Sequence, residues 1–290
     1  MLTKRRIKHV SPANKVNMGG FLVRQPLPTR ELKDLNPFLL LHHAVVSYKD
    51  APGADQSGVG PHPHRGFSPV SFVFKGGVHH RDSLGNNSIV YEGGVQWINS
   101  GKGIIHSERP PAELIGSEQE QEFIQLWVNT PAAFKMNEPI YQGFGKNEIP
   151  TVLSPDQKIE FAIVAGEQFG TNGPVTSNTN VNASMLKMQK DGVSQIEIQK
   201  GHVAFLYLLS GSIAINGETI EAKNMIVFEN EGDVFELKVF QNSSGLLVSG
   251  EPIDEPVETY GPFVMNTQTE IIQALQDAQN GKMGVLVEEF

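Results

Sequence analysis

The chain has 290 residues, which is enough for one large domain or two ordinary ones, each with its own hydrophobic core. Its 23 basic and 32 acidic side chains give a formal net charge of −9. This balance argues against direct nucleic-acid binding, because binding phosphates depends on clustered positive charge. Cysteine is absent, which excludes disulfides, thiolate metal sites and thiol nucleophiles.

The sequence shows no sign of a targeting or membrane segment. Its basic start, Lys4-Arg5-Arg6, is not followed by an apolar run with a small-residue cleavage site. No apolar run approaches the roughly 18 residues of a membrane-spanning helix. We therefore expect a cytoplasmic protein that makes no membrane contact, with its basic N-terminus exposed to solvent.

The first half of the chain carries short β-rich runs. Residues 1–35 hold turn signals and are expected to be irregular, and residues 37–41 to form a buried strand. Glycine pairs then separate short runs of strand-forming residues, at 70–74, 88–91, 95–98 and 122–128. This spacing predicts an antiparallel barrel or sandwich, with no room for crossover helices. Residues 131–150, rich in proline and glycine, are interpreted as a linker.

The strand pattern then resumes. Strands are expected at 161–164, 185–188, 196–198, 202–209, 213–215, 225–228, 235–239 and 246–248. Asn216-Gly217 predicts a type I′ hairpin, and Thr267 to Glu270 form a capping box that starts a helix. Ile271, Leu275 and Ala278 form the apolar face of that helix. The sequence thus predicts an all-β fold of two consecutive barrels, over 1–140 and 141–290, with a C-terminal helix.

Two triplets in the first half carry metal-capable side chains at alternate positions. His62-Pro63-His64 is followed 42 residues after its second histidine by His106-Ser107-Glu108. On strands, alternate residues share a face and sit roughly 6.6 Å apart. Two such strands would aim three imidazoles and one carboxylate at a single point. That set suits a first-row transition metal and leaves coordination positions free. The second half has no such pair of triplets and is expected to lack a metal.

Other histidines offer weaker candidates. In His79-His80 the two side chains of a strand would point to opposite faces, so at most one could face the same cavity. We expect His80 or its neighbour to line or support the site rather than to bind the ion. His42-His43 has the same limitation, and a structural role is the better interpretation. Neither a phosphate-binding loop nor Gly-x-Ser-x-Gly is present.

The residues around the triplets resemble the pirin family of the cupin superfamily. Residues 61–67, Pro-His-Pro-His-Arg-Gly-Phe, resemble its first metal motif, and residues 94–97 with 103–108 resemble its second. Further similarity in the same order covers nearly the whole chain, at 36–40, 80–85, 125–129, 255–256 and 261–266.

The resemblance implies two cupin barrels (double-stranded β-helix, or jelly-roll) with one metal in the N-terminal barrel, commonly iron. Nickel, copper, cobalt, manganese and zinc suit the same donors. By motif the ligands carry over to His62, His64, His106 and Glu108. Pirins often have an acid four positions after His64, where this chain has Ser68. Glu108 is therefore the only acidic ligand candidate.

The resemblance implies two functions. Some pirins resemble quercetin 2,3-dioxygenases, which open a flavonol ring with dioxygen; in that case Glu108 would be the catalytic base and Phe67 a candidate for the pocket wall. Others regulate protein partners, as transcription cofactors or regulators of metabolic enzymes, and there the metal would sense redox state. We favour the dioxygenase and keep the redox-sensing, protein-binding module as the alternative, because fold alone does not choose between them.

Overall fold

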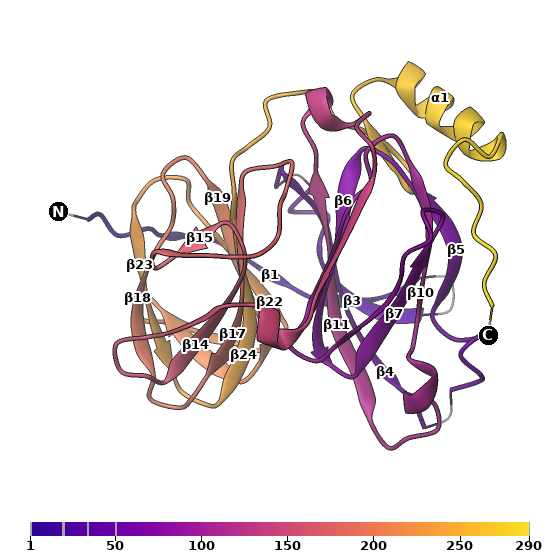
Figure 1. The fold of residues 1–290 in the computed structure, drawn as a ribbon. Coiled ribbons are helices and arrows are strands. Elements are labelled where there is room, and N and C mark those ends of the chain that lie inside the picture. Colours follow the sequence, from indigo (N-terminus) through magenta and orange to yellow (C-terminus); the bar gives the residue numbers. More distant parts are fainter. Residues whose placement is uncertain (1, 19–20, 34, 50, 290) are drawn as a thin grey trace. The chain divides into compact units, whose positions relative to one another are not determined.

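The computed structural model describes residues 2–18, 21–33, 35–49 and 51–289 (Figure 1). Within these ranges strands dominate and α1 (Gln268–Gln279) is the single α-helix. The all-β class with a C-terminal helix is therefore confirmed. In the described part of the chain, no helix has both the length and the apolar character needed to cross a membrane.

The chain divides into two compact units, each of which takes in one end of the chain. The first unit holds residues 1–42 and 147–252, and the second holds residues 43–146 and 253–290. This differs from the contiguous halves, 1–140 and 141–290, that the sequence predicts. The internal boundary falls within a few residues of the expected one, but each terminal segment packs with the strands of the other half. Local sequence patterns do not show such distant pairing.

The first unit is a sandwich of two antiparallel sheets. One runs in the order β1 (Ile7–Pro12), β22 (Asn224–Phe228), β19 (Val203–Ser210), β24 (Ser243–Gly250), β17 (Val181–Met188), β14 (Ile159–Ala165) and β13 (Thr151–Leu153). The other runs β18 (Val193–Glu197), β23 (Val234–Val239), β20 (Ser212–Ile215) and β21 (Glu218–Glu221). Buried side chains of both sheets, such as Phe161 and Phe235, form one continuous core. The short hairpin β15 (Glu167–Gln168)–β16 (Thr171–Asn172) completes the unit.

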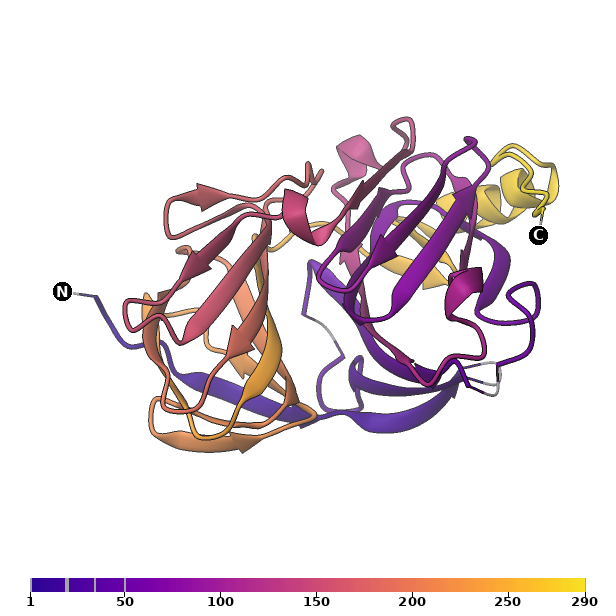
Figure 2. The same ribbon diagram turned by 60° about the horizontal axis from the view of Figure 1, so that its bottom comes forward.

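The N-terminal segment forms strands, which corrects the expectation of an irregular start; of its basic cluster, Lys4, Arg6 and Lys8 are exposed as expected and Arg5 is buried. Strand β1 pairs with β22, with Val10 opposite Ile226, and lies beside the orange strands in Figure 2. Arg5 is fully buried, and its guanidinium donates hydrogen bonds to the carbonyl oxygens of Glu229 and His202. A cation of this kind is tolerated in an interior because carbonyl acceptors replace water.

The turn between β20 and β21 has the expected hairpin form. Asn216 and Gly217 both have positive φ, 54° and 90°, and Ile215 pairs with Glu218. The predicted type I′ signal is therefore confirmed, because this turn needs two residues that tolerate the left-handed region.

The second unit also consists of two sheets. One has the order β5 (Val59–His64), β10 (Ile104–Arg109), β7 (Gly77–Asp82) and β8 (Asn87–Tyr91). The other has seven strands, in the order β12 (Ile140–Phe144), β9 (Val95–Asn99), β6 (Phe67–Lys75), β11 (Glu120–Asn129), β4 (Phe38–Ser47), β3 (Phe21–Leu27) and β2 (Asn14–Met18). Strands β2 and β3 and the first residues of β4 lie in the range 1–42. Three short 3₁₀ turns, Ala112–Leu114, Ala132–Phe134 and Lys146–Glu148, lie in the connections.

Residues 131–150 are not a free linker, as the sequence suggested. Within them β12 pairs with β9 over five positions, from Ile140 opposite Asn99 to Phe144 opposite Val95. Of the prolines and glycines that suggested a linker, Pro139 and Gly145 flank this strand, Gly143 lies within it, and Pro131 and Pro150 lie outside it. The strand is at the edge of its sheet, where such residues are tolerated. The segment therefore belongs to the second unit as a strand.

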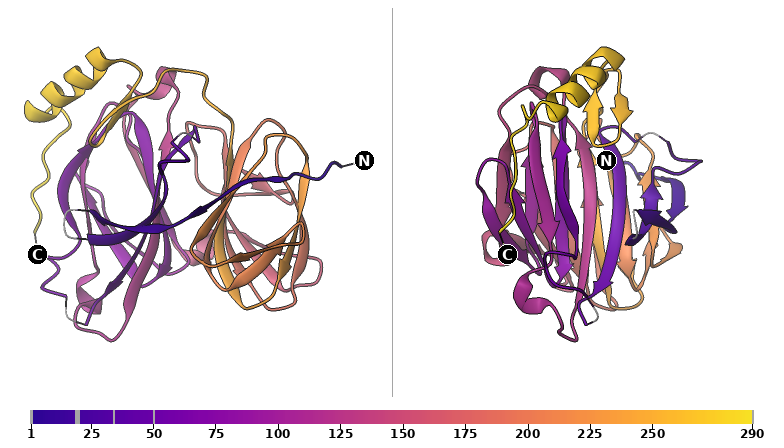
Figure 3. Two further views of the ribbon diagram at one scale, coloured as in Figure 1. Left: turned by 180° about the vertical axis from the view of Figure 1, so that it is seen from behind. Right: turned by 90° about the vertical axis from the view of Figure 1, so that its right-hand side faces the viewer.

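The C-terminal helix docks on the second unit, beside the strands that Figure 3 shows in purple and magenta. Thr267 caps it, accepting a hydrogen bond from the Glu270 amide at 3.2 Å, and the Glu270 carboxylate accepts one from the Asn266 amide at 3.1 Å. Its apolar face packs on Phe263 and Met265 of β26 (Phe263–Met265), which pairs with β25 (Glu258–Tyr260). The expected capping box and apolar stripe are confirmed.

A buried ionic cluster in the second unit yields a prediction about acid stability. The Glu122 carboxylate lies 3.0 Å from His43 Nε2 and 3.0 Å from Lys75 Nζ. The hydrogen bond from His43, with help from Lys75 and against the effect of burial, lowers the pKa of Glu122 to about 2. This folded-state pKa is below the unfolded one, so the stabilisation is complete above about pH 4.5 and is lost as the pH falls towards 2.

We expect the folded state to lose about 2 kcal/mol of the stabilisation from Glu122 when the pH falls from 7 to 3. Glu122→Gln should therefore show a smaller fall in urea stability over this range than the unchanged protein, and a lower stability at pH 7. Glu118→Gln is the control, because Glu118 forms an exposed pair with Lys49. Equal pH dependence in all three proteins would show that the cluster contributes nothing.

Candidate metal centre

The pairing of β10 with β5 and β7 brings the two triplets together. His106 stands opposite His62 in the β5–β10 ladder, and Ile104 stands opposite His64. Because alternate strand residues share a face, His62 and His64 project to the same side as His106. A register shift after His106 places Glu108 opposite Val59. The strand placement that the spacing predicted is what brings these side chains together.

The three imidazoles form a tight cluster. One ring nitrogen from each of His62, His64 and His106 lies within 4.8 Å of the others, and the two Nε2 atoms of His62 and His64 are 3.0 Å apart. His64 and His106 are buried and His62 is half-buried. Among the described residues the cluster holds these three side chains, and the Glu108 carboxylate lies outside it.

The second ring nitrogens show which atoms are available as ligands. His62 Nδ1 lies 2.8 Å from the Gly60 carbonyl oxygen and His64 Nδ1 lies 3.4 Å from that of Pro262. A carbonyl only accepts, so each Nδ1 carries the proton and each Nε2 keeps a lone pair. His106 Nε2 is buried and has no hydrogen-bond partner among the described residues. Three lone pairs facing one spot fit a metal ion, since ligating histidines hold their other nitrogen in this way.

Burial also favours the ligating form of the rings. It lowers the pKa of His64 and of His106 well below the usual value, and the neighbouring imidazoles lower both further. Both rings are therefore neutral at pH 7, which is the protonation state that binds metals.

Glu108 is held by neutral donors rather than by a cation. Its Oε1 accepts hydrogen bonds from the Ser71 hydroxyl, at 2.8 Å, and from the Gln96 amide, and its Oε2 accepts one from the Gln125 amide at 2.8 Å. These donors come from β6, β9 and β11 and fix the orientation of the carboxylate. A carboxylate offers about four acceptor positions, so one on Oε2 stays free.

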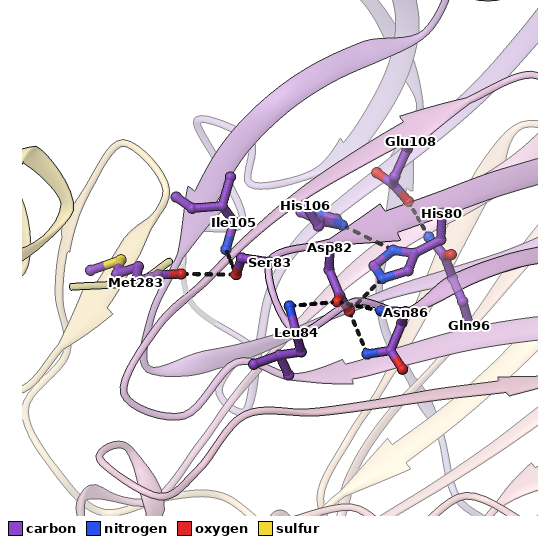
Figure 4. A network of polar contacts seen from close by, with 10 residues as sticks. All are labelled: His80, Asp82, Ser83, Leu84, Asn86, Gln96, Ile105, His106, Glu108 and Met283. Atoms are coloured by element: carbon purple, nitrogen blue, oxygen red, sulfur yellow. Dashed lines mark hydrogen bonds and ion pairs between the residues drawn. The ribbon is translucent and has the colours of Figure 1, made fainter. Parts of the chain in front are cut away.

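His80 lies next to His106, one member of the cluster (Figure 4). Its Nδ1 is 3.4 Å from His106 Nδ1, and its Nε2 is 2.9 Å from Asp82 Oδ2. The ring stacks on Tyr141 of β12, with centroids 4.0 Å apart and planes 10° apart. His79, by contrast, points to the other face and bonds to Asn87, and His42 bonds to Gln25.

Aromatic rings border the cluster on the side of His64. The Phe67 ring meets the His64 ring edge-on, with the ring centroids 5.1 Å apart, and its centroid lies 4.4 Å from that of the Trp127 ring. Trp127 also contacts His64, at 5.7 Å. Ser68, which stands where pirins often have an acid, instead donates to Asn99 at 3.0 Å. An apolar, aromatic wall therefore stands beside the cluster.

Sequence reasoning missed several of these residues. Ser71, Gln96, Gln125, Asp82 and Tyr141 all touch the candidate ligands or their partners. Asp82 had a signal, because it stands two residues after His80 and shares its face. Gln96 lies within the second motif. Tyr141 had none, since its segment resembled a linker.

Two cupin-type sandwich units, one of them with a cluster of histidines, define the class of protein. Sequence models of two families match the chain: Pirin over residues 20–128 and the Pirin C-terminal cupin domain over residues 184–284. The chain belongs to the pirin family.

The relatives of the chain span nearly its full length. A putative quercetin 2,3-dioxygenase from Pseudomonas aeruginosa is 35% identical, over 93% of this chain and 95% of its own. Human pirin is 35% identical, over 91% of this chain and 89% of its own. The crystal structure of quercetin 2,3-dioxygenase from Acinetobacter baumannii has a TM-score of 0.90 at 33% identity, covering 98% of this chain and all of the other. The pirin YhhW of Escherichia coli, solved in complex with nickel(II), shares the fold, with a TM-score of 0.65 at 19% identity, over 84% and 99% of the chains.

Metal binding by the histidine cluster should stabilise the protein. With nickel(II) at about 100 times its dissociation constant, we expect the free energy of unfolding to rise by about 2.7 kcal/mol. His106→Ala should abolish most of this gain, which thermal unfolding with and without nickel(II) measures. His79→Ala is the matched control on the other face of β7. A gain of equal size in the His106→Ala variant would contradict the assignment.

Proposed function

We propose that this chain is a metal-dependent dioxygenase that cleaves a flavonol such as quercetin with dioxygen. The observation that carries the proposal is the cluster of three imidazoles, each with one ring nitrogen within 4.8 Å of the others, beside an aromatic wall. The names of the relatives from P. aeruginosa and A. baumannii support the reaction and the substrate class. Iron as the resident metal and the cytoplasmic location stay predictions.

The chain supplies a ligand set that leaves room for chemistry. His62, His64 and His106 would hold the ion, with Glu108 as the proposed fourth ligand. When bound, a divalent transition metal lowers the pKa of a coordinated hydroxyl group and keeps further positions open for substrate and dioxygen. A structural site would instead be saturated by protein ligands.

Glu108 is the proposed base for the flavonol 3-hydroxyl group. Ser71, Gln96 and Gln125 hold its carboxylate in place through three hydrogen bonds. The acceptor position that remains on Oε2 would serve Glu108 as a ligand, and Glu108 would take the proton there on loosening from the ion. None of the three donors is charged, so none of them forms an ion pair with the carboxylate.

Aromatic side chains would position the flat substrate. Phe67 is fully buried beside His64, and Trp127 is half-buried next to it. Flat aromatic ligands pack well against such rings, in offset or edge-on arrangements. Phe67 and Trp127 therefore form the wall against which we expect the flavonol rings to lie.

Replacing Glu108 tests the proposed base. Glu108→Gln keeps the size of the side chain but removes the proton acceptor, so quercetin turnover by the metal-loaded protein should fall about 100-fold or more. The measurement is loss of the visible absorbance of quercetin, with metal content determined on the same sample. Glu118→Gln, at an exposed position, is the control.

Two results would contradict the proposal. If Glu108→Gln retained full turnover with the same metal content, Glu108 would not be the base. If fully loaded protein left quercetin unchanged, this substrate would be excluded. Relatives of similar identity carry both kinds of name, pirin and quercetin dioxygenase. The alternative, a redox-sensing module for a protein partner, would then be tested by comparing partner retention on affinity columns in the two oxidation states.

A further inference from the structure

A chain of buried polar groups leads away from the histidine cluster. His106 Nδ1 faces His80 Nδ1 at 3.4 Å, and His80 Nε2 faces Asp82 Oδ2 at 2.9 Å. The side chains of His80 and Asp82 are both fully buried. In Figure 4, dashed lines join His106 to His80 and His80 to Asp82.

The positions of the protons along this chain follow from its far end. The Asp82 carboxylate only accepts, so His80 Nε2 must carry a proton and donate it. In a neutral ring the other nitrogen, Nδ1, is then an acceptor. His106 Nδ1 must therefore be the donor to it, which leaves the lone pair of His106 on Nε2, the nitrogen that is buried without a hydrogen-bond partner among the described residues.

We propose that His80 and Asp82 are positioning residues that fix the tautomer of His106 and so make its Nε2 available to the metal. This inference rests on the proposed metal centre and deepens it, because it gives the centre a supporting pair that the ligand motifs do not contain. Ligand-supporting hydrogen bonds of this kind affect metal affinity by about 10- to 100-fold when they are removed.

The surroundings of Asp82 fix the direction of these hydrogen bonds. Its Oδ1 accepts from the backbone amides of Leu84 and Asn86, at 2.9 and 3.0 Å, and its Oδ2 accepts from the Asn86 side chain at 2.8 Å. Two backbone amides cannot turn away, so the atom at the Oδ1 position must remain an oxygen. In Asp82→Asn, the amide group would therefore occupy the Oδ2 position and donate to His80.

Asp82→Asn would exchange the donor and acceptor nitrogens of both His80 and His106. His80 Nε2 would become the acceptor and its Nδ1 would carry the proton. A protonated His80 Nδ1 facing a protonated His106 Nδ1 would leave both without an acceptor, which is costly in a buried place. His106 would move its proton to Nε2, the atom that the metal needs. Tyr141 stacks flat on His80 and restricts the ring from turning to avoid this outcome.

Two measurements on the full chain test the proposal. Nitrogen-15 NMR of the metal-free protein reports which nitrogen of His106 carries the proton. Competition titration with a chelator gives the affinity for nickel(II). We expect the Nδ1–H tautomer in the unchanged protein, the Nε2–H tautomer in Asp82→Asn, and an affinity about 10- to 100-fold lower in Asp82→Asn and in His80→Phe.

Matched variants separate this effect from general damage. His79→Phe changes the neighbouring histidine on the other face and should leave tautomer and affinity unchanged. Asn86→Ala removes one hydrogen bond to Asp82 without reversing any donor, so it should keep the Nδ1–H tautomer and lose less affinity than Asp82→Asn.

The proposal is overturned by an Nε2–H tautomer of His106 in the unchanged protein. It is also overturned by equal nickel(II) affinity in Asp82→Asn and the unchanged protein. Equal losses in Asn86→Ala and Asp82→Asn would also overturn it, because the reversal of donors would then not be the cause. If the unchanged protein bound no nickel(II), the metal centre itself would fail, while the tautomer measurement would still decide the role of His80 and Asp82.

Discussion

The candidate metal centre of the second unit gathers the ring nitrogens of three histidines, with their lone pairs, in one place. His64 and His106 are buried and neutral, and the Nε2 of His106 has no hydrogen-bond partner among the described residues. An unsatisfied buried acceptor costs about 1–3 kcal/mol, so a folded protein rarely keeps one without a compensating role. Facing imidazole lone pairs also repel each other, and a cation between them removes both costs. The close placement of the imidazole lone pairs, which is unfavourable without an ion, is therefore also what would make the cluster bind a cation.

The strand β10 joins this site to the C-terminal end of the chain. His106 and Glu108 point to the inner face, and the alternate residues Ser107 and Arg109 point outwards. On that outer face the Arg109 guanidinium binds both carboxylate oxygens of Glu288, at 3.1 and 2.6 Å. This geometry is the strong, bidentate form of an ion pair, and the Glu288 side chain is almost fully buried. The end of the chain thus holds the back of the strand that carries two of the proposed ligands, which explains why residues 253–290 belong to the second unit.

Features that depend on a local residue pattern, such as turns, caps and strand faces, could be predicted from the sequence. Contacts between segments far apart in the sequence could not. Alternation along the strands was enough to place His62, His64 and His106 on one face. The Thr267 cap and the Asn216-Gly217 turn were also local signals, and both were correct. Burial of Arg5 could not be foreseen, because its acceptors, the carbonyls of Glu229 and His202, are about 200 residues away in the sequence. The place of Tyr141 beside His80 was not predicted for the same reason, because it results from the pairing of β12 with β9.

The neutral surroundings of Glu108 matter for the kind of ligand that the site would favour. Three neutral imidazoles and one carboxylate would leave one positive charge on a divalent ion. Ser68 adds no charge, and its hydroxyl bonds to Asn99. Gln96 and Gln125 likewise orient Glu108 without adding charge. The remaining positive charge favours an anionic oxygen over a neutral one, because electrostatic interactions strengthen where water is excluded. A flavonol that has given up its 3-hydroxyl proton carries such an oxygen, and Glu108 is the group that we propose takes this proton.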